Sequence, residues 1–207
     1  MCKSNVGLEN GTTAEGAGDA VGVPQRHWFV AFVGHNAEKS CRDRLIKEGY
    51  EAFVASQQEV HFWRNGKRKV IEVVIITNYV FVRATEMERR QIVNFPYIKS
   101  FMVNKSASLT ENGFRSIAII PDKEMEMLKY MLHRAEYPVQ FLTQFAKGDK
   151  VKVVRGTMTG VEGHIVEMKD STDKYIGINI GSLGCAVVHI SPKDVVKSIK
   201  SPKGSVG

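Results

Sequence analysis

The 207-residue sequence predicts an α+β protein, in which an antiparallel sheet with packed helices is followed by a small all-β module. Residues 26–137 mix strand patterns with three helical patterns, which predicts the first part. Residues 147–200 hold only short alternating strands and glycine-rich turns, which predicts the second. Residues 1–25 have no aromatic residue, so we expect a disordered tail there, and we assign 201–207 to a second tail.

The first structured segment is an aromatic and β-branched strand from His27 to Val33. A helix is expected from Ala37 to Gly49, because Ala37, Cys41 and Leu45 recur at four-residue spacing. Asn36 is the candidate N-cap, and Gly49 provides the stop.

Strand patterns dominate the next forty residues. A short strand at 51–54 precedes a hairpin built from Val60, Phe62 and residues 70–74, with an Asn-Gly pair in its basic loop. Residues 75–83, IITNYVFVR, form the strongest strand pattern in the chain.

Helix and strand then alternate. We expect a helix over 85–94, which ends before Pro96, strands over 98–103 and 117–120, and a third helix after Pro121-Asp122. Apolar residues at helical spacing predict the inner face of the third helix: Met125, Leu128, Met131 and Leu132. Residues 138–146 read as a connector whose apolar side chains pack against the rest of the protein.

The C-terminal module begins with a strand, a glycine-punctuated turn and a second strand between Lys147 and Met168. Val151 and Val153 alternate with two lysines, and the three glycines of the turn supply positive φ or close approach: Gly156, Gly160 and Gly163. Together with the alternating isoleucines of residues 176–180, this pattern fits a small closed barrel of about five strands.

The formal net charge is +7 and the sequence pI is about 9.3, which favours anionic partners. The excess is +4 in residues 27–146 (17 basic against 13 acidic) and +4 in 147–207 (10 against 6). The three cysteines are scattered without metal or disulfide spacing, and no apolar run reaches the ~20 residues that span a bilayer. We therefore expect a cytoplasmic protein without membrane association.

No catalytic constellation is present in the sequence. The six histidines lack metal-ligand spacing, and there is no GxSxG or phosphate-loop motif. Glu124 and Glu126 point to different faces of a helix, so they do not form an acid/base pair. We predict no enzyme activity, no catalytic residue, no metal and no cofactor.

Residues 147–168 resemble a KOW motif, and the N-terminal part resembles the N-terminal (NGN) domain of the NusG family. The second resemblance lies in HWFVAFV, in the basic loop RNGKRK and in the strand IITNYVFV. The chain keeps Asn78 to Val82 of the family pattern but has Ile76-Thr77 where the family has Phe-Pro. The implied layout is an NGN domain at 26–137, a linker at 138–146 and an SH3-like KOW barrel at 147–200.

These departures, with the polar N-terminal tail, favour a specialised paralogue similar to RfaH or to the UpxY-like regulators of polysaccharide operons. A housekeeping NusG remains an alternative. The composition of residues 150–190, rich in Val, Ile and Gly, opposes a helix, so we expect a stable barrel without an α-helical alternate state.

The resemblance implies a monomeric transcription elongation or antitermination factor that suppresses pausing or termination. Its N-terminal domain would dock an apolar patch on the clamp helices of RNA polymerase. The candidate polymerase-binding residues are Phe29, Ile76, Tyr79 and Phe81. The competing interpretation is that these residues are buried sheet core.

Basic residues are candidates for contact with the phosphate backbone of non-template DNA or nascent RNA. They are Lys39, Arg42, Lys67, Arg68, Lys69, Arg89 and Arg90. His35 and Asn36 are weaker candidates for base contacts. A basic strip of Lys150, Lys152 and Arg155 is the expected KOW partner surface, with Rho, a ribosomal protein or RNA as its partner.

Two other classes stay open from the sequence. One is a KOW-type RNA-binding or ribosome-associated protein, which would bind naked RNA without polymerase. The other is an enzyme with a basic regulatory domain, which would need a concave polar site.

Overall fold

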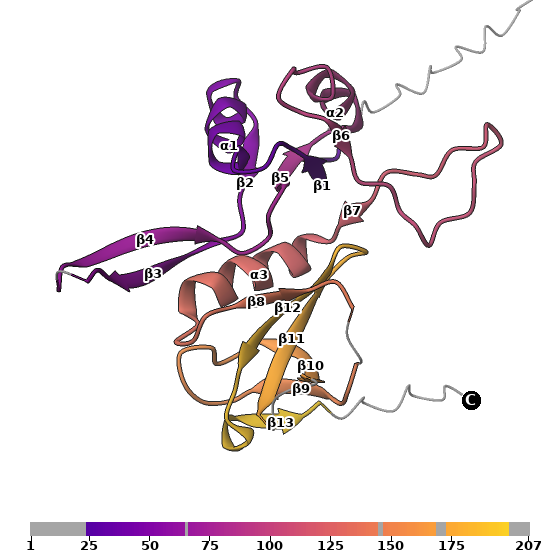
Figure 1. Cartoon of the computed structure of the whole chain (residues 1–207). Helices are drawn as coiled ribbons and strands as arrows, with labels where there is room; N and C mark the ends of the chain where they lie inside the picture. The colour runs from indigo at the N-terminus through magenta and orange to yellow at the C-terminus, as the bar shows by residue number, and fades with distance from the viewer. Residues whose placement is uncertain (1–23, 65, 145–146, 169–172, 199–207) are drawn as a thin grey trace, which may run out of the picture.

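The computed structural model describes residues 24–64, 66–144, 147–168 and 173–198. An N-terminal sheet and a C-terminal sheet lie on either side of one helix, and a two-stranded hairpin projects from the body (Figure 1). The tails expected at 1–25 and 201–207 fall outside the described residues, apart from residues 24 and 25.

The N-terminal sheet is antiparallel and has the strand order β2-β5-β1-β6, with β7 also paired to β1. Its strands are β1 (His27–Phe32), β2 (Glu51–Phe53), β5 (Tyr79–Ala84), β6 (Ser100–Phe101) and β7 (Ile119–Ile120). The central pair, β1 and β5, is the most apolar, as its aromatic and β-branched residues predict.

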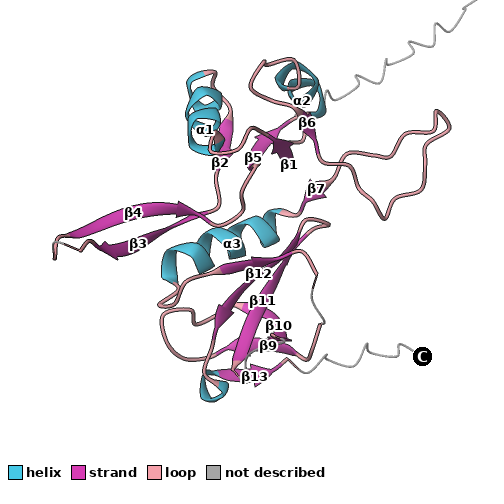
Figure 2. Cartoon of the chain, viewed as in Figure 1, coloured by secondary structure: helices cyan, strands magenta, loops and turns pink. Residues whose placement is uncertain are grey.

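Helices cover both faces of this sheet (Figure 2). On one face, α1 (Glu38–Lys47) and α2 (Glu86–Ile92) contribute Leu45 and Ile92 to a core that includes Phe29 of β1. On the other face, α3 (Asp122–Arg134) packs against Trp28. The predicted inner face of α3 is confirmed, because all four of its residues are buried: Met125, Leu128, Met131 and Leu132.

Several element boundaries differ from the sequence prediction. The N-cap of α1 is Ala37 without a side-chain hydrogen bond, and Asn36 instead takes a positive φ of 58°. The strand predicted from Ile75 begins at Tyr79, because Asn78 has a φ of 67° and breaks the extended backbone. By contrast, α2 has a full capping box at Thr85 and ends at Ile92, close to the predicted bounds.

The hairpin consists of β3 (Ser56–Phe62) and β4 (Arg68–Val74), which pair with each other along their whole length. They form a separate two-stranded sheet. At the tip, the amide of Gly66 donates to the carbonyl of Trp63 over 2.9 Å, and Gly66 has a φ of 75°. A positive φ is readily available to glycine, so the predicted turn is confirmed at Gly66, while Asn65 lies outside the described residues.

The C-terminal sheet is antiparallel with the order β13-β9-β10-β11-β12-β8. Its strands are β8 (Gln140–Leu142), β9 (Lys150–Val153), β10 (Glu162–Glu167), β11 (Lys174–Ile180), β12 (Gly184–His189) and β13 (Val195–Lys197), with a 3-10 turn η1 (Pro192–Asp194) before β13. Part of the expected connector is therefore the edge strand β8. Gly163 is a true close approach, since a Cβ there would lie 2.5 Å from the carbonyl oxygen of Gly177.

Helix α3 also contacts the C-terminal sheet, so the two sheets share one continuous core that includes Leu128 and Ile178. The amide of Gly181 donates to Glu124 Oε2 over 2.6 Å. Gly181 has a φ of 50°, and a Cβ there would lie 2.5 Å from Ile120 Cδ1, so glycine suits this position. The tyrosine hydroxyl of Tyr130 donates to the carbonyl of Thr157 over 3.3 Å.

The contact between Glu124 and Gly181 predicts that the stability of the packed structure depends on pH. Burial raises the pKa of Glu124, and this outweighs the opposing effects of the Gly181 amide and the charge of Lys147. The packed arrangement therefore binds the carboxyl proton more tightly, and its extra stability is lost as the pH rises through the raised pKa. We expect the Glu124→Gln variant to lack this contribution to the pH dependence of the free energy of unfolding.

Urea denaturation of the wild type and of the Glu124→Gln variant, each at mildly acidic and at neutral pH, measures this contribution. The free energy of unfolding of the wild type should fall more between the acidic and the neutral buffer than that of Glu124→Gln. An equal change in both proteins would show that another group controls the pH dependence.

Candidate functional site

Antiparallel pairing of β1 with β5 arranges the aromatic residues of the candidate docking face. Phe32 lies opposite Tyr79, and Val30 lies opposite Phe81. Cross-strand partners share a face, so Tyr79 and Phe81 point to the same side of the sheet, as the sequence predicts. This is the side that α3 covers.

Most of this face is buried. Phe81 is 0% exposed, Ile76 1% and Trp28 3%. Phe32 and Tyr79 are only half-buried, and their rings meet edge to face with centroids 5.2 Å apart. We call these two residues the aromatic edge, because their side chains are partly accessible at the rim of this face. Phe53, which pairs with Phe81, is also half-buried, but its ring lies under the ammonium of Lys129.

Phe29 does not belong to this face. Its side chain is 2% exposed and lies in the opposite core, edge to face with Phe101 at 6.1 Å. The predicted grouping of Phe29 with Tyr79 and Phe81 therefore does not form one surface. Phe32 takes its place. Alternation along the first strand separates Phe29 from Phe32, but the pairing register with β5 is needed to show that Phe32 is on the Tyr79 side.

A buried carboxylate positions the start of β5. Glu38, in the first turn of α1, is 3% exposed, and its Oε1 accepts a hydrogen bond of 2.7 Å from the amide of Asn78. This contact holds the left-handed turn at Asn78, and the turn sets where Tyr79 begins. Sequence reasoning missed Glu38, because an acidic residue in the first turn of a helix is common.

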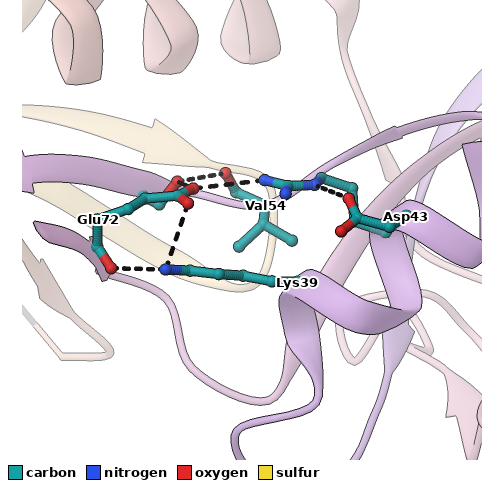
Figure 3. Close-up of polar contacts among 6 residues, drawn as sticks. Lys39, Asp43, Val54 and Glu72 are labelled. Carbon is teal, nitrogen blue, oxygen red and sulfur yellow. Dashed lines mark hydrogen bonds and ion pairs between the residues drawn. The ribbon is translucent and has the colours of Figure 1, made fainter.

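Lys39 and Arg42 lie at the base of the hairpin and both contact Glu72 of β4 (Figure 3). The ammonium of Lys39 donates to the carbonyl of Glu72 over 2.6 Å, and Ser56 Oγ donates to the Glu72 carboxylate over 2.6 Å. The hydroxyl of Ser56, with further help from Lys39 and Arg42, lowers the pKa of Glu72. Lys39 and Arg42, which the sequence analysis assigned to phosphate contact, therefore anchor the hairpin to α1.

Arg89 and Arg90 both contact Glu86, at 2.7 Å and 3.2 Å. The side chain of Arg89 is 12% exposed, and its guanidinium lies 5.4 Å from the centre of the Phe101 ring. Arg90 is far more exposed, at 74%. Of this pair, Arg90 is the better placed to meet a phosphate.

The three remaining candidates, Lys67, Arg68 and Lys69, are exposed on the distal part of the hairpin. Residues 60–71 contain no acidic residue, and Arg64 adds a fourth positive charge. The tip of the hairpin is therefore a concentrated positive patch on a ribbon fixed at its base.

On the C-terminal sheet, Lys150 and Lys152 face Glu162 of the neighbouring strand at 4.0 Å and 3.9 Å. Arg155 follows β9 and lines a hollow of about 140 Å³ beside Tyr137. The strip thus consists of two partly neutralised lysines and one exposed arginine. His35 and Asn36 are exposed at the junction between β1 and α1.

Within the described ranges, no group of three His, Cys, Asp or Glu side chains could hold a metal ion. None of the helices seen there is long and apolar enough to cross a membrane.

The family model for NusG, described as transcription termination factor nusG, matches residues 26–129. The chain belongs to the NusG family. The matched segment runs from β1 into α3, so it covers the N-terminal sheet, the hairpin and the aromatic edge. Proteins of this family are non-enzymatic transcription factors, which indicates a role in transcription elongation for this chain.

Solved structures show weaker likeness. The structure titled "Domain interaction in Thermotoga maritima NusG" is 16% identical, with a TM-score of 0.43 over 84% of this chain and 97% of that one. Conformations A and B of the MjSpt4:Spt5 complex are 12% and 13% identical, with TM-scores of 0.25 and 0.26 over 84% of this chain and 99% of those chains. A search of curated protein sequences finds no significant match. The family assignment rests on the family model.

Proposed function

We propose that this NusG-family protein is a transcription elongation or antitermination factor that binds the clamp helices of RNA polymerase through its N-terminal domain. The observation that carries the proposal is the aromatic edge, Phe32 and Tyr79, which is partly exposed at the rim of a buried apolar face. Aromatic side chains with one covered and one open side are typical anchors for a partner helix.

The hairpin supplies the second contact in this proposal. Its distal cations, Lys67, Arg68 and Lys69, would meet the phosphate backbone of the non-template DNA strand, and exposed Arg90 could extend the contact. Such contacts hold the factor on the transcription complex without reading sequence. Suppression of pausing then follows from a protein that bridges polymerase and DNA.

The C-terminal sheet would serve as a KOW barrel that recruits a further partner, such as Rho or a ribosomal protein. Its short antiparallel strands and glycine turns support this assignment. The exposed surface of Lys150, Lys152 and Arg155 is the proposed contact. A role at a polysaccharide operon would fit the departures at Ile76-Thr77 and Asn78 from the family pattern.

Single-round transcription by bacterial RNA polymerase on a template with one strong pause tests this function. We expect the full chain to shorten the pause half-life at concentrations at which it binds the elongation complex. A chain that neither binds the complex nor changes pausing, yet binds naked RNA, would support the RNA-binding alternative instead.

A further inference from the structure

Two aromatic side chains at the tip of the hairpin are exposed without a function in the scheme above. Phe62 is 74% exposed and Trp63 is 60% exposed, whereas the other tryptophan, Trp28, is 3% exposed. Large aromatic residues are usually buried, so adjacent exposed ones on a projecting element indicate a binding site.

The strand register places these two aromatics on opposite faces of the ribbon. Phe62 pairs with Arg68, and Val60 pairs with Val70, so this face is mainly apolar. Trp63 lies opposite Lys67, because its amide donates to the Lys67 carbonyl over 2.9 Å. Side chains two residues apart on one strand share a face.

The pair His61 and Lys69 therefore lies on the same side as Trp63. We call the side formed by Trp63, Lys67, Lys69 and His61 the tryptophan face. The indole ring thus shares its face with two lysines, on a stretch with no acidic residue between 60 and 71. Charge complementarity selects a polyanion as the ligand.

The base of the hairpin is anchored to the body of the protein. Ser56, Lys39 and Arg42 hold the base of β4 through Glu72. On the other strand, Gln57 Oε1 accepts a hydrogen bond of 2.9 Å from the amide of Val139. The ribbon then extends away from both sheets, which leaves its tip accessible (Figure 1).

We propose that the tryptophan face binds single-stranded nucleic acid, with Trp63 stacked on an unpaired base while Lys67 and Lys69 contact the flanking phosphates. Stacking needs a base with a free face, which a duplex covers with its neighbours, so the ligand is a single strand. The inference rests on the proposed function, since the transcription complex provides the displaced strand. It goes further by assigning base stacking to Trp63, in addition to the phosphate contacts of the lysines.

Anisotropy titration of the full chain with a labelled oligothymidine, and with a duplex of equal length, tests the inference. The variant Trp63→Ala should weaken single-strand binding about tenfold or more, as base–aromatic stacking usually contributes. Trp63→Phe should retain binding within about threefold, because the ring still stacks. Phe62→Ala is the matched control, because Phe62 is also exposed but lies on the other face, and this variant should bind like wild type.

Salt dependence separates the two parts of the contact. For single strands the logarithm of the affinity falls with a slope of about −0.7 per phosphate neutralised, so Lys67→Ala with Lys69→Ala should reduce the slope by about 1.4. Trp63→Ala should leave the slope unchanged, since the indole carries no charge.

Three results would overturn the inference. They are no measurable oligothymidine binding by the wild type, equal losses of oligothymidine affinity in Trp63→Ala and Phe62→Ala, and a loss of affinity in Trp63→Ala that is the same for the single strand and the duplex.

Polymerase binding by the wild type and by Trp63→Ala is measured in parallel. If the wild type binds polymerase but not oligothymidine, the stacking role of Trp63 is wrong and the proposed function is unaffected. If polymerase binding fails while Trp63 still controls oligothymidine binding, the proposed function falls and the stacking role stands.

Discussion

Replacing Phe81 by alanine is expected to lower the free energy of unfolding by about 3–5 kcal/mol, the usual cost of removing a buried ring. Phe81 is 0% exposed, and its ring centre lies 6.2 Å from that of Phe53. Because it belongs to the core that continues through α3 into the C-terminal sheet, the cavity affects both halves of the chain. Urea denaturation followed by circular dichroism measures the loss.

The matched comparison is Tyr79→Ala on the same strand and the same face. Tyr79 is half-buried, so its truncation should cost clearly less than that of Phe81. If Phe81→Ala unfolds at the wild-type urea concentration, α3 does not cover this part of the sheet. The docking face would then extend inward beyond the aromatic edge.

The double variant Phe32→Ala and Tyr79→Ala is expected to weaken polymerase binding by about 30-fold or more while the chain stays folded. Central aromatic anchors commonly contribute about 2 kcal/mol or more to an interface, and each 1.4 kcal/mol is about tenfold in affinity. Both side chains are only partly buried, so their loss leaves a smaller defect than the loss of the fully buried Phe81.

Phe114→Ala is the control for this variant, because Phe114 is 74% exposed on a loop that lies between β6 and β7. It should bind polymerase like wild type. Equal affinities of the wild-type chain and the double variant, with both proteins folded, would exclude the aromatic edge as the docking site.

Local patterns in the sequence predicted much of the fold. The four-residue spacing of apolar residues predicted the buried face of α3, and alternation predicted the strands of the C-terminal sheet. The glycine positions were also predictable, since Gly156 and Gly160 take positive φ and Gly163 allows close approach. Each of these features depends on residues that are close together in the chain.

Features that depend on distant residues were not predictable in the same way. The start of β5 is set by Glu38, which lies 40 residues before Asn78. The environment of Lys39 and Arg42 depends on Glu72, on another element. Phe29 was grouped with Tyr79 on aromatic character, and only the β1–β5 register shows that Phe32 is the neighbour of Tyr79.

Sequence and structure together therefore separate two kinds of aromatic residue. Phe81, Phe29 and Trp28 hold the N-terminal sheet between its helices. Phe32 and Tyr79 at its rim, and Trp63 at the hairpin tip, are available to partners. The protein would thus contact polymerase through the aromatic edge and nucleic acid through the tip of the hairpin.

Site-specific photo-crosslinking tests the central claim most directly. A benzoylphenylalanine at position 79 and, separately, at the control position 114 is irradiated in the presence of a bacterial RNA polymerase elongation complex. The account predicts a crosslink from position 79 to the clamp helices and none from position 114. No crosslink from position 79 to polymerase, or equal crosslinks from both positions, would contradict docking through the aromatic edge.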